Sequence, residues 1–429
     1  MSLKSLPLAM GNVVAEVTLP GSKSLSNRVF LIASIAEGQS VIENIPLSKD
    51  VLAGIGVLKA LGIKNDFDEN LGRIMIQGSN GYFPKEHAKI FCNEAGTLTR
   101  FIIPLCAAQQ SGEYHIYAGK RMMRRPIAEQ LRVLEELGMA VEYKAQNYKL
   151  PITILAKGLK QRKVLSINGN QSSQFLSGLL ITAPLIEGGL KIYSKTDHRQ
   201  PYVQMTVDMM RDFGISVDVD KQYYQVAGGQ SYQAGYYAIE PDISTASYFW
   251  GLAAITHGNV KIKNVRLNAK QGDIRFLEVL QKMGCTIISV EDGISVIGSQ
   301  TLKGVSIDMR NFSDTFMTVA AIACFAEDET HITGLSHTRF QESDRVSVMA
   351  EGLMCLGMKV TTTIDSIHIY PKASKLKAAI VEVYDDHRIA MSLALIGLRQ
   401  EGVVINGAEC VSKSCPDYFE RMEKIIQLS

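Results

Sequence analysis

The chain has 429 residues, of which 46% are hydrophobic and 21% are charged, so it is an ordinary globular sequence too long for a single core. Its formal net charge is +2, which argues against a long polyanion such as nucleic acid as a partner and leaves its basic side chains to act locally. Seven scattered cysteines contain no C-x-x-C pair, which argues against a disulfide framework or a zinc site. With no signal-like or membrane-length apolar run, we expect a cytoplasmic protein of two or more domains and no membrane partner.

The first informative stretch, Leu19 to Arg28, has the pattern of a strand end, a tight turn and a helix start. Ser22 or Ser24 can cap the helix, and Arg28 lies one turn beyond Ser24 on the same face. A helix N-terminus carries unpaired N–H groups and partial positive charge, so Lys23, Ser24 and Arg28 indicate an anion site. A plain surface helix start explains the same residues equally well when they are taken alone.

The same order of elements is expected six times along the chain. Each unit begins with a polar helix start and a buried helix, continues with a β-like segment, and closes with an amphipathic helix that ends in glycine. Five of these glycines, at intervals of 76, 76, 70 and 73 residues, are Gly62, Gly138, Gly214, Gly284 and Gly357. A sixth unit runs from 385 to the end and stops within its second helix, expected over 418–426. Such a period predicts repeated supersecondary units.

The polar helix starts lie at equivalent places in the six units. In chain order they are Ser22-Lys23-Ser24, Ala95-Gly96-Thr97, Ser172-Ser173-Gln174, Ser244-Thr245-Ala246, Ser313-Asp314-Thr315 and Asp385-Asp386-His387-Arg388. The β-like segments that follow them span 39–45, 113–117, 189–193, 259–265, 330–333 and 402–406. Capping explains any single start, but a purely structural solenoid has no need to concentrate polar and charged residues at equivalent places in every unit. Arranged around common axes, the helix dipoles would aim at one point.

The chain contains partial matches to two nucleotide-binding motifs, and both are incomplete. Gly54-Ile55-Gly56 begins like a dinucleotide fingerprint, but Lys59 stands where the third glycine belongs. The segment 21–24 resembles the end of a phosphate-binding P-loop and lacks its leading glycine and spacer. His387 is a lone histidine, which is more often structural than a metal ligand. We therefore expect no metal and no organic cofactor.

Nine short motifs follow one another along essentially the whole chain. They are Pro20-Gly21-Ser22-Lys23-Ser24-Leu25-Ser26-Asn27-Arg28, Ala95-Gly96-Thr97, Arg124-Arg125-Pro126-Ile127, Ser172-Ser173-Gln174-Phe175-Leu176, Pro201-Tyr202, Gln271-Gly272-Asp273-Ile274-Arg275-Phe276, Glu342-Ser343-Asp344-Arg345, Asp386-His387-Arg388 and Ser412-Lys413-Ser414. Together they resemble the signatures of the 5-enolpyruvylshikimate-3-phosphate synthases, a family of enolpyruvyl transferases. The resemblance implies an α/β fold, a two-domain inside-out α/β barrel of six βαβαββ repeats, three per domain. Residues 22–239 would form one domain and residues 1–21 plus 240–429 the other, with the active site in the interdomain cleft.

The reaction that the resemblance implies belongs to the shikimate pathway, which leads to chorismate and the aromatic amino acids. The enolpyruvyl group of phosphoenolpyruvate is transferred to the 5-hydroxyl of shikimate 3-phosphate through a tetrahedral intermediate, and phosphate is released. Both substrates are multiply anionic, so a cluster of cations fits them, and the intermediate needs an acid and a base. We expect these small anions to be the only partners of a monomeric enzyme.

The resemblance also assigns residues to the two substrates. The phosphoenolpyruvate site would consist of Lys23, Gly96, Arg125, Gln174, Arg345, Arg388 and Lys413. Lys23, Arg125 and Lys413 would surround the phosphate, while Arg345 and Arg388 would hold the carboxylate with their planar forks. The shikimate 3-phosphate site would consist of Lys23, Ser24, Arg28, Ser172, Ser173, Gln174, Arg199, Tyr202, Asp314, His337 and Gln341.

The catalytic residues implied are Asp314, Glu342 and Lys23. Asp314 would take the proton of the acceptor hydroxyl, and Glu342, assisted by Lys23, would protonate the methylene carbon of phosphoenolpyruvate. The surrounding cations favour the charged form of both carboxylates, so Glu342 needs burial or a like-charged neighbour to stay protonated.

Four residues depart from the family pattern, and they leave alternatives open. Glu94 and His337 each stand where an asparagine is usual, Arg199 where a serine is usual, and Gln341 where a lysine is usual. Loss of a lysine removes a charge-assisted contact of about 1.5 to 3 kcal/mol, which Arg199 could restore from another direction. One alternative is a paralogous enolpyruvyl transferase with a different cyclic alcohol as acceptor. The other is a non-catalytic member that binds an anion, although the retained catalytic residues argue against it.

Overall fold

The computed structural model describes residues 2–161, 164–195 and 201–428. The chain divides into two compact units, each with its own hydrophobic core. The continuous unit is Gly21–Ile239, and the composite unit joins the residues up to Pro20 to those from Glu240 onward. The sequence-based division places its first boundary one residue later and its second at the same position.

Three four-stranded sheets are described in the continuous unit, and they share one strand order. In each, two parallel strands lie beside an antiparallel hairpin. In sheet order the strands are β14 (Tyr236–Ala238), β3 (Gln39–Glu43), β5 (Arg73–Gln77) and β4 (Asn65–Asp68); β6 (His87–Phe91), β7 (Glu113–Tyr117), β9 (Ile152–Leu155) and β8 (Ala140–Tyr143); and β10 (Leu165–Ile167), β11 (Leu190–Ser194), β13 (Tyr223–Val226) and β12 (Asp218–Asp220). Because β14 ends the unit and pairs with β3 near its start, the first and third repeats are tied together.

The composite unit repeats this pattern with strands from the beginning of the chain. Its sheets are β2 (Val14–Val17), β15 (Asn259–Lys263), β17 (Gly293–Ile297) and β16 (Thr286–Val290); β18 (Ser306–Asp308), β19 (Thr330–Thr333), β21 (Ile367–Tyr370) and β20 (Lys359–Thr362); and β22 (Ala379–Glu382), β23 (Val403–Asn406) and β1 (Leu3–Lys4). In the last sheet no antiparallel hairpin follows β23 among the described residues. Instead β1 pairs antiparallel with β23, with Leu3 opposite Asn406.

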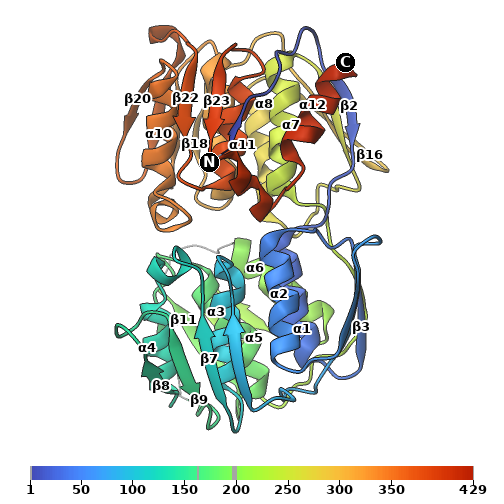
Figure 1. The fold of residues 1–429 in the computed structure, drawn as a ribbon, viewed down its shortest axis with the longest axis vertical. Coiled ribbons are helices and arrows are strands. Elements are labelled where there is room, and N and C mark those ends of the chain that lie inside the picture. Colours follow the sequence, from blue (N-terminus) through green and yellow to red (C-terminus); the bar gives the residue numbers. More distant parts are fainter. Residues whose placement is uncertain (1, 162–163, 196–200, 429) are drawn as a thin grey trace. The chain divides into compact units, whose positions relative to one another are not determined.

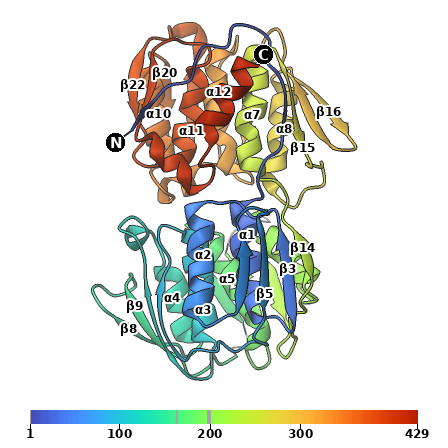
Figure 2. The same cartoon turned by 45° about the vertical axis from the view of Figure 1, so that its right-hand side comes forward.

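Each repeat contributes one inner and one outer helix (Figures 1 and 2). The inner helices are α1 (Lys23–Ile35), α3 (Gly96–Ala107) and α5 (Gln174–Thr182) in the continuous unit, and α7 (Ile243–Thr256), α9 (Phe316–Ile322) and α11 (His387–Ile396) in the composite unit. The outer helices are α2 (Lys49–Ala60), α4 (Ala128–Glu136), α6 (Pro201–Asp212), α8 (Phe276–Lys282), α10 (Arg345–Cys355) and α12 (Tyr418–Gln427).

The inner helices are buried on all sides. Every residue of α7 is buried, and α3 is buried throughout although it carries Arg100 and Thr97 near its start. Helices with no polar face must pack against other elements on every side. Accordingly α3 contacts α1 and α5, while α9 contacts α7 and α11, and the sheets of each unit lie around these helices. Each unit therefore has the inside-out α/β architecture.

All five helix-ending glycines adopt the conformation that the sequence predicts. Their φ angles are +80° at Gly62, +96° at Gly138, +83° at Gly214, +101° at Gly284 and +89° at Gly357. This left-handed region favours glycine because it has no Cβ. These helix ends could be predicted from the sequence because each needs a glycine immediately after an amphipathic segment.

Two local expectations can be compared directly with the structure. Ser22 occupies the N-cap position of α1, but its side chain makes no capping hydrogen bond, and Ser24 lies inside the helix, so the expected side-chain cap is wrong. The glycine pair of residues 54–56 lies within α2, as its helical pattern predicted. None of the helices in the described ranges combines the length and apolar character needed to cross a lipid bilayer.

Candidate active site

Arg345, the first residue of α10, is the centre of a charged cluster in the composite unit. Its Nη1 lies 3.0 Å from Asp314 Oδ1, and its Nη2 lies 2.8 Å from Glu342 Oε2. Its Nε donates to Asp386 Oδ2 at 2.8 Å, and Gln341 Oε1 accepts a further hydrogen bond from Nη1. Burial opposes the charged guanidinium, but the three carboxylates outweigh this effect and raise the pKa of Arg345 above its ordinary value. The cluster therefore holds a fully charged arginine at a side-chain exposure of 2%.

Asp314 connects this arginine to Arg388. Its Oδ2 accepts a hydrogen bond from Arg388 Nη2 at 3.0 Å. Burial again opposes the charge of Arg388, and Asp314 is the first of several groups that raise its pKa well above the ordinary value. Asp314 comes from the 3₁₀ turn Ser313–Thr315 that leads into α9, and Arg388 from the first turn of α11. Two helix starts that are far apart in sequence thus meet through one carboxylate.

Asp386 is a buried carboxylate that bonds to both Arg345 and Arg388. Its side chain has no exposure and accepts hydrogen bonds from Ser343 Oγ and from the Arg388 N–H, both at 3.0 Å, as well as from Arg345. The bond to the Arg388 N–H caps α11. Although Asp386 stands in a recognised motif, the sequence analysis gave it no role.

Glu342 is paired with two cations. Lys413 Nζ is 3.8 Å from Glu342 Oε1, and the opposite oxygen is paired with Arg345. The side chain of Glu342 is 11% exposed, and it shares Arg345 with the carboxylate of Asp314. Glu342 is therefore largely buried and shares Arg345 with a second carboxylate, while two cations, Arg345 and Lys413, lie against it.

His337 and Gln341, two of the departures from the family pattern, belong to the same unit. Gln341 accepts a hydrogen bond from Arg345, and His337 Nε2 lies 2.8 Å from Ser313 Oγ, next to Asp314 in sequence. The structure thus brings together Asp314, His337, Gln341, Glu342, Arg345, Arg388 and Lys413 through these contacts.

In the continuous unit, Lys23 begins α1 and faces the first turn of α2. Its Nζ lies 3.5 Å from Asp50 Oδ2, and the two side chains are 11% and 4% exposed. Asp50 was not anticipated from the sequence, because nothing local links it to a lysine 27 positions earlier.

Arg28 is a buried cation whose hydrogen bonds to described residues go to neutral oxygens. It donates to Thr206 Oγ1 at 2.8 Å, to the Ser24 carbonyl at 2.9 Å and to the Tyr202 carbonyl at 3.2 Å. Burial lowers the pKa of Arg28 to about 9. Within the described part of the chain no carboxylate is paired with it. A desolvated charge of this kind is stabilised by an anionic ligand.

The starts of α3 and α5 are joined by side chains. Gln174 Nε2 donates to Thr97 Oγ1 at 2.9 Å, and Gln174 Oε1 accepts from Arg100 Nη1 at 2.7 Å. Ser172 Oγ accepts the Gln174 N–H at 3.2 Å, and Ser173 is the N-cap residue. Arg100 is 1% exposed and was missed by the sequence analysis, although it lies one turn beyond a recognised motif.

Gly96 allows Arg125 to lie against the start of α3. A Cβ built at Gly96 would lie 2.5 Å from Arg125 Nη1, which is closer than such atoms approach. Any side chain at this position must therefore displace the guanidinium.

Glu94 anchors the segment that carries Arg125. Its Oε2 accepts the Met122 N–H at 2.8 Å, and its Oε1 accepts the Arg121 N–H at 3.3 Å, at the start of the 3₁₀ turn Met122–Arg124. The carboxylate that departs from the family pattern is thus engaged by backbone donors. Arg199, another departure, lies outside the described residues.

The family model for EPSP synthase (3-phosphoshikimate 1-carboxyvinyltransferase) matches residues 8–422. The chain belongs to this family. It is 37% identical over 428 residues to the 3-phosphoshikimate 1-carboxyvinyltransferase of Trichormus variabilis, with 99% of this chain and 100% of the relative covered. It is 38% identical over 419 residues to that of Sulfurovum sp., with 96% and 97% covered.

Solved structures agree with the family assignment. The EPSP synthase of Acinetobacter baumannii superimposes with a TM-score of 0.82 at 27% identity, covering 99% of this chain and 98% of that chain. The enolpyruvyl transferase NikO from Streptomyces tendae gives a TM-score of 0.74 at 15% identity, with 99% and 97% covered, which supports the fold alone.

Proposed function

We propose that this chain transfers the enolpyruvyl group of phosphoenolpyruvate to the 5-hydroxyl of shikimate 3-phosphate and releases phosphate. The observation that carries the proposal is the placement of Asp314, a partly exposed carboxylate fixed by two buried arginines. Family membership over residues 8–422 supports the substrate assignment. The proposal includes two functional domains of three repeats each, a monomeric state and a cytoplasmic location, the last supported by the free cysteines.

The cations are assigned to phosphoenolpyruvate by charge and geometry. Arg345 and Arg388 hold its carboxylate, because a planar guanidinium can donate two parallel hydrogen bonds to such a group. Lys23, Arg125 and Lys413 neutralise its phosphate. Gly96 and Gln174 complete this set, since Gly96 admits Arg125 and Gln174 fixes the start of α5.

Arg28 is assigned to the carboxylate of shikimate 3-phosphate, since its buried charge has no anionic partner among the described side chains. The hydroxyls and phosphate of this substrate are assigned to residues at helix starts and on the following turns, which supply hydroxyl, amide and ring donors. These residues are Ser24, Ser172, Ser173, Gln174, Tyr202, His337 and Gln341. Arg199, which lies outside the described residues, is assigned to the same substrate from the sequence.

The chemistry proceeds by addition and elimination. In the first step Asp314 takes the proton of the 5-hydroxyl while the hydroxyl oxygen bonds to C2 of phosphoenolpyruvate. Glu342 donates a proton to C3, which becomes a methyl group. In the second step the C2–O bond to the phosphate breaks and Lys23 neutralises the departing phosphate. Asp314 gives this phosphate the proton that it took from the 5-hydroxyl, and Glu342 takes a proton back from the methyl group. The vinyl ether forms and both carboxyl groups return to their starting states.

Phosphate release from phosphoenolpyruvate tests the proposal. The full chain is expected to release phosphate only when shikimate 3-phosphate is added, with one enolpyruvyl ether formed per phosphate by mass spectrometry. Turnover with another cyclic alcohol and none with shikimate 3-phosphate would instead select the paralogous reading. Binding of both substrates without phosphate release would select a non-catalytic protein.

A further inference from the structure

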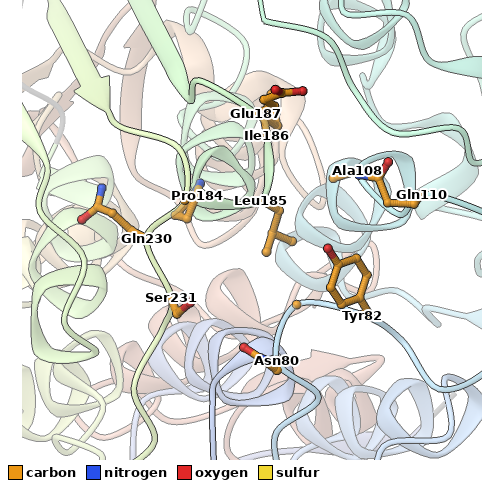
Figure 3. Close-up of a pocket in the computed structure, with 12 residues that line it drawn as sticks. Asn80, Tyr82, Ala108, Gln110, Pro184, Leu185, Ile186, Glu187, Gln230 and Ser231 are labelled. Atoms are coloured by element: carbon orange, nitrogen blue, oxygen red, sulfur yellow. The ribbon is translucent and has the colours of Figure 1, made fainter.

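A cavity of about 410 Å³ lies in the continuous unit at the C-terminal ends of its inner helices (Figure 3). The Asn80 and Gly81 N–H groups bond to the carbonyls of Ala36 and Ile35, which places this wall at the end of α1. Lys23 begins the same 13-residue helix, so about 20 Å separates the cavity from that site residue. The volume lies within the usual range for small-molecule sites.

The cavity is lined by apolar side chains on one side and by neutral polar side chains elsewhere. Ala108, Pro184, Leu185 and Ile186 supply the apolar side, and the ring of Tyr82, 64% exposed, stands beside them. Figure 3 shows Leu185 projecting into the space between Tyr82 and Ser231. The neutral polar side chains are Asn80, Gln110, Gln230 and Ser231.

The electrostatic environment of the cavity favours positive charge. Among the described residues that line it, Glu187 is the one charged residue, and none is a lysine, arginine or histidine. Helices α1, α3 and α5 end here, and none carries a basic residue in its last turn. The partial negative charge of a helix C-terminus is therefore not offset within these helices.

We propose that this cavity binds a small organic cation, an ammonium group joined to a short aromatic or aliphatic body. The ammonium lies near Glu187, and the apolar body packs on Leu185 and the Tyr82 ring, which also attracts a cation through its π-face. This site is independent of the proposed catalytic function, since its residues take no part in the transfer reaction.

An NMR titration of the full chain with 2-phenylethylammonium tests the proposal. Saturable binding is expected, while the neutral analogue 2-phenylethanol binds about threefold more weakly and the anionic phenylacetate more weakly still. Glu187→Gln is expected to weaken the cation about threefold. The matched variant Glu69→Gln removes an exposed carboxylate elsewhere in the same unit and leaves the affinity unchanged.

Leu185→Trp fills the cavity and is expected to abolish binding. Should that variant fail to fold, Tyr82→Ala replaces it, because Tyr82 is exposed, and a loss of about threefold is expected. The absence of saturation, equal affinity for the three probes, or unchanged affinity in both Glu187→Gln and the cavity variant overturns the proposal.

Discussion

Arg388 donates a hydrogen bond to Asp314 across 74 positions of sequence, with Nη2 3.0 Å from Oδ2. Because the other oxygen of Asp314 accepts from Arg345, the carboxylate is held at both ends and its orientation is fixed. A general base must be positioned as well as charged.

Replacing Asp314 by Asn keeps the shape and removes the charge of the base. Turnover is expected to fall about 10²- to 10⁴-fold, the usual contribution of general base catalysis, while the KM of each substrate changes far less. Steady-state kinetics measure both quantities. A variant that retains turnover within a few-fold of the parent excludes Asp314 as the base.

Asp386→Asn tests whether the buried carboxylate of Asp386 stabilises the folded chain by pairing with Arg345. The change removes the leading countercharge of buried Arg345, and breaking a buried pair typically costs about 3 to 5 kcal/mol in the free energy of unfolding. Chemical denaturation measures the loss. Asp385→Asn is the matched control, because Asp385 is exposed and its positive φ suits asparagine. Equal free energies of unfolding for the two variants would show that the Asp386 carboxylate does not stabilise buried Arg345.

Gly96→Ala is expected to raise the KM for phosphoenolpyruvate about tenfold or more with a smaller change for shikimate 3-phosphate. The new methyl group would lie 2.5 Å from Arg125 Nη1, so the guanidinium must shift and a charge-assisted contact with the substrate is weakened. Gly56→Ala, where a Cβ meets no atom within 4 Å, controls for the loss of a helical glycine. An unchanged KM in Gly96→Ala means that Arg125 does not bind this substrate.

Arg28 predicts a pH dependence of acceptor binding. Its pKa is lowered to about 9 by burial, so its charge is lost as pH rises through this value and the KM for shikimate 3-phosphate rises above pH 9. Above pH 9 Arg28 is still protonated in the unfolded chain but loses its proton in the folded one. The contribution of Arg28 to the free energy of unfolding therefore increases with pH in this range. Arg28→Gln is expected to have a high KM at every pH and to lose this dependence. A flat profile between pH 7 and 10 in the parent contradicts the assignment.

The repeats and the helix-ending glycines could be predicted because each rests on a local pattern. Gly62 and Gly138, for example, need only an amphipathic helix before them to be recognised. The use of β1 as the last strand of the sixth sheet was not predicted, since a two-residue strand has no detectable period.

The site was predicted unevenly for a related reason. The motifs selected Arg345 and Arg388, which both bond to Asp314. They did not select Asp50 or Arg100, because the partners of these residues, Lys23 and Gln174, are distant in sequence. The first pairing is created by packing of an inner helix against an outer one and the second by packing of two inner helices, and neither leaves a mark in the local order of residues.

The most direct test of the addition–elimination account is the transfer reaction run in deuterated water. If Glu342 protonates C3 and then removes a proton from the methyl group, the enolpyruvyl product carries deuterium on its vinyl carbon by mass spectrometry, and Glu342→Gln loses incorporation together with phosphate release. Product formed at the normal rate without deuterium on that carbon would contradict the mechanism.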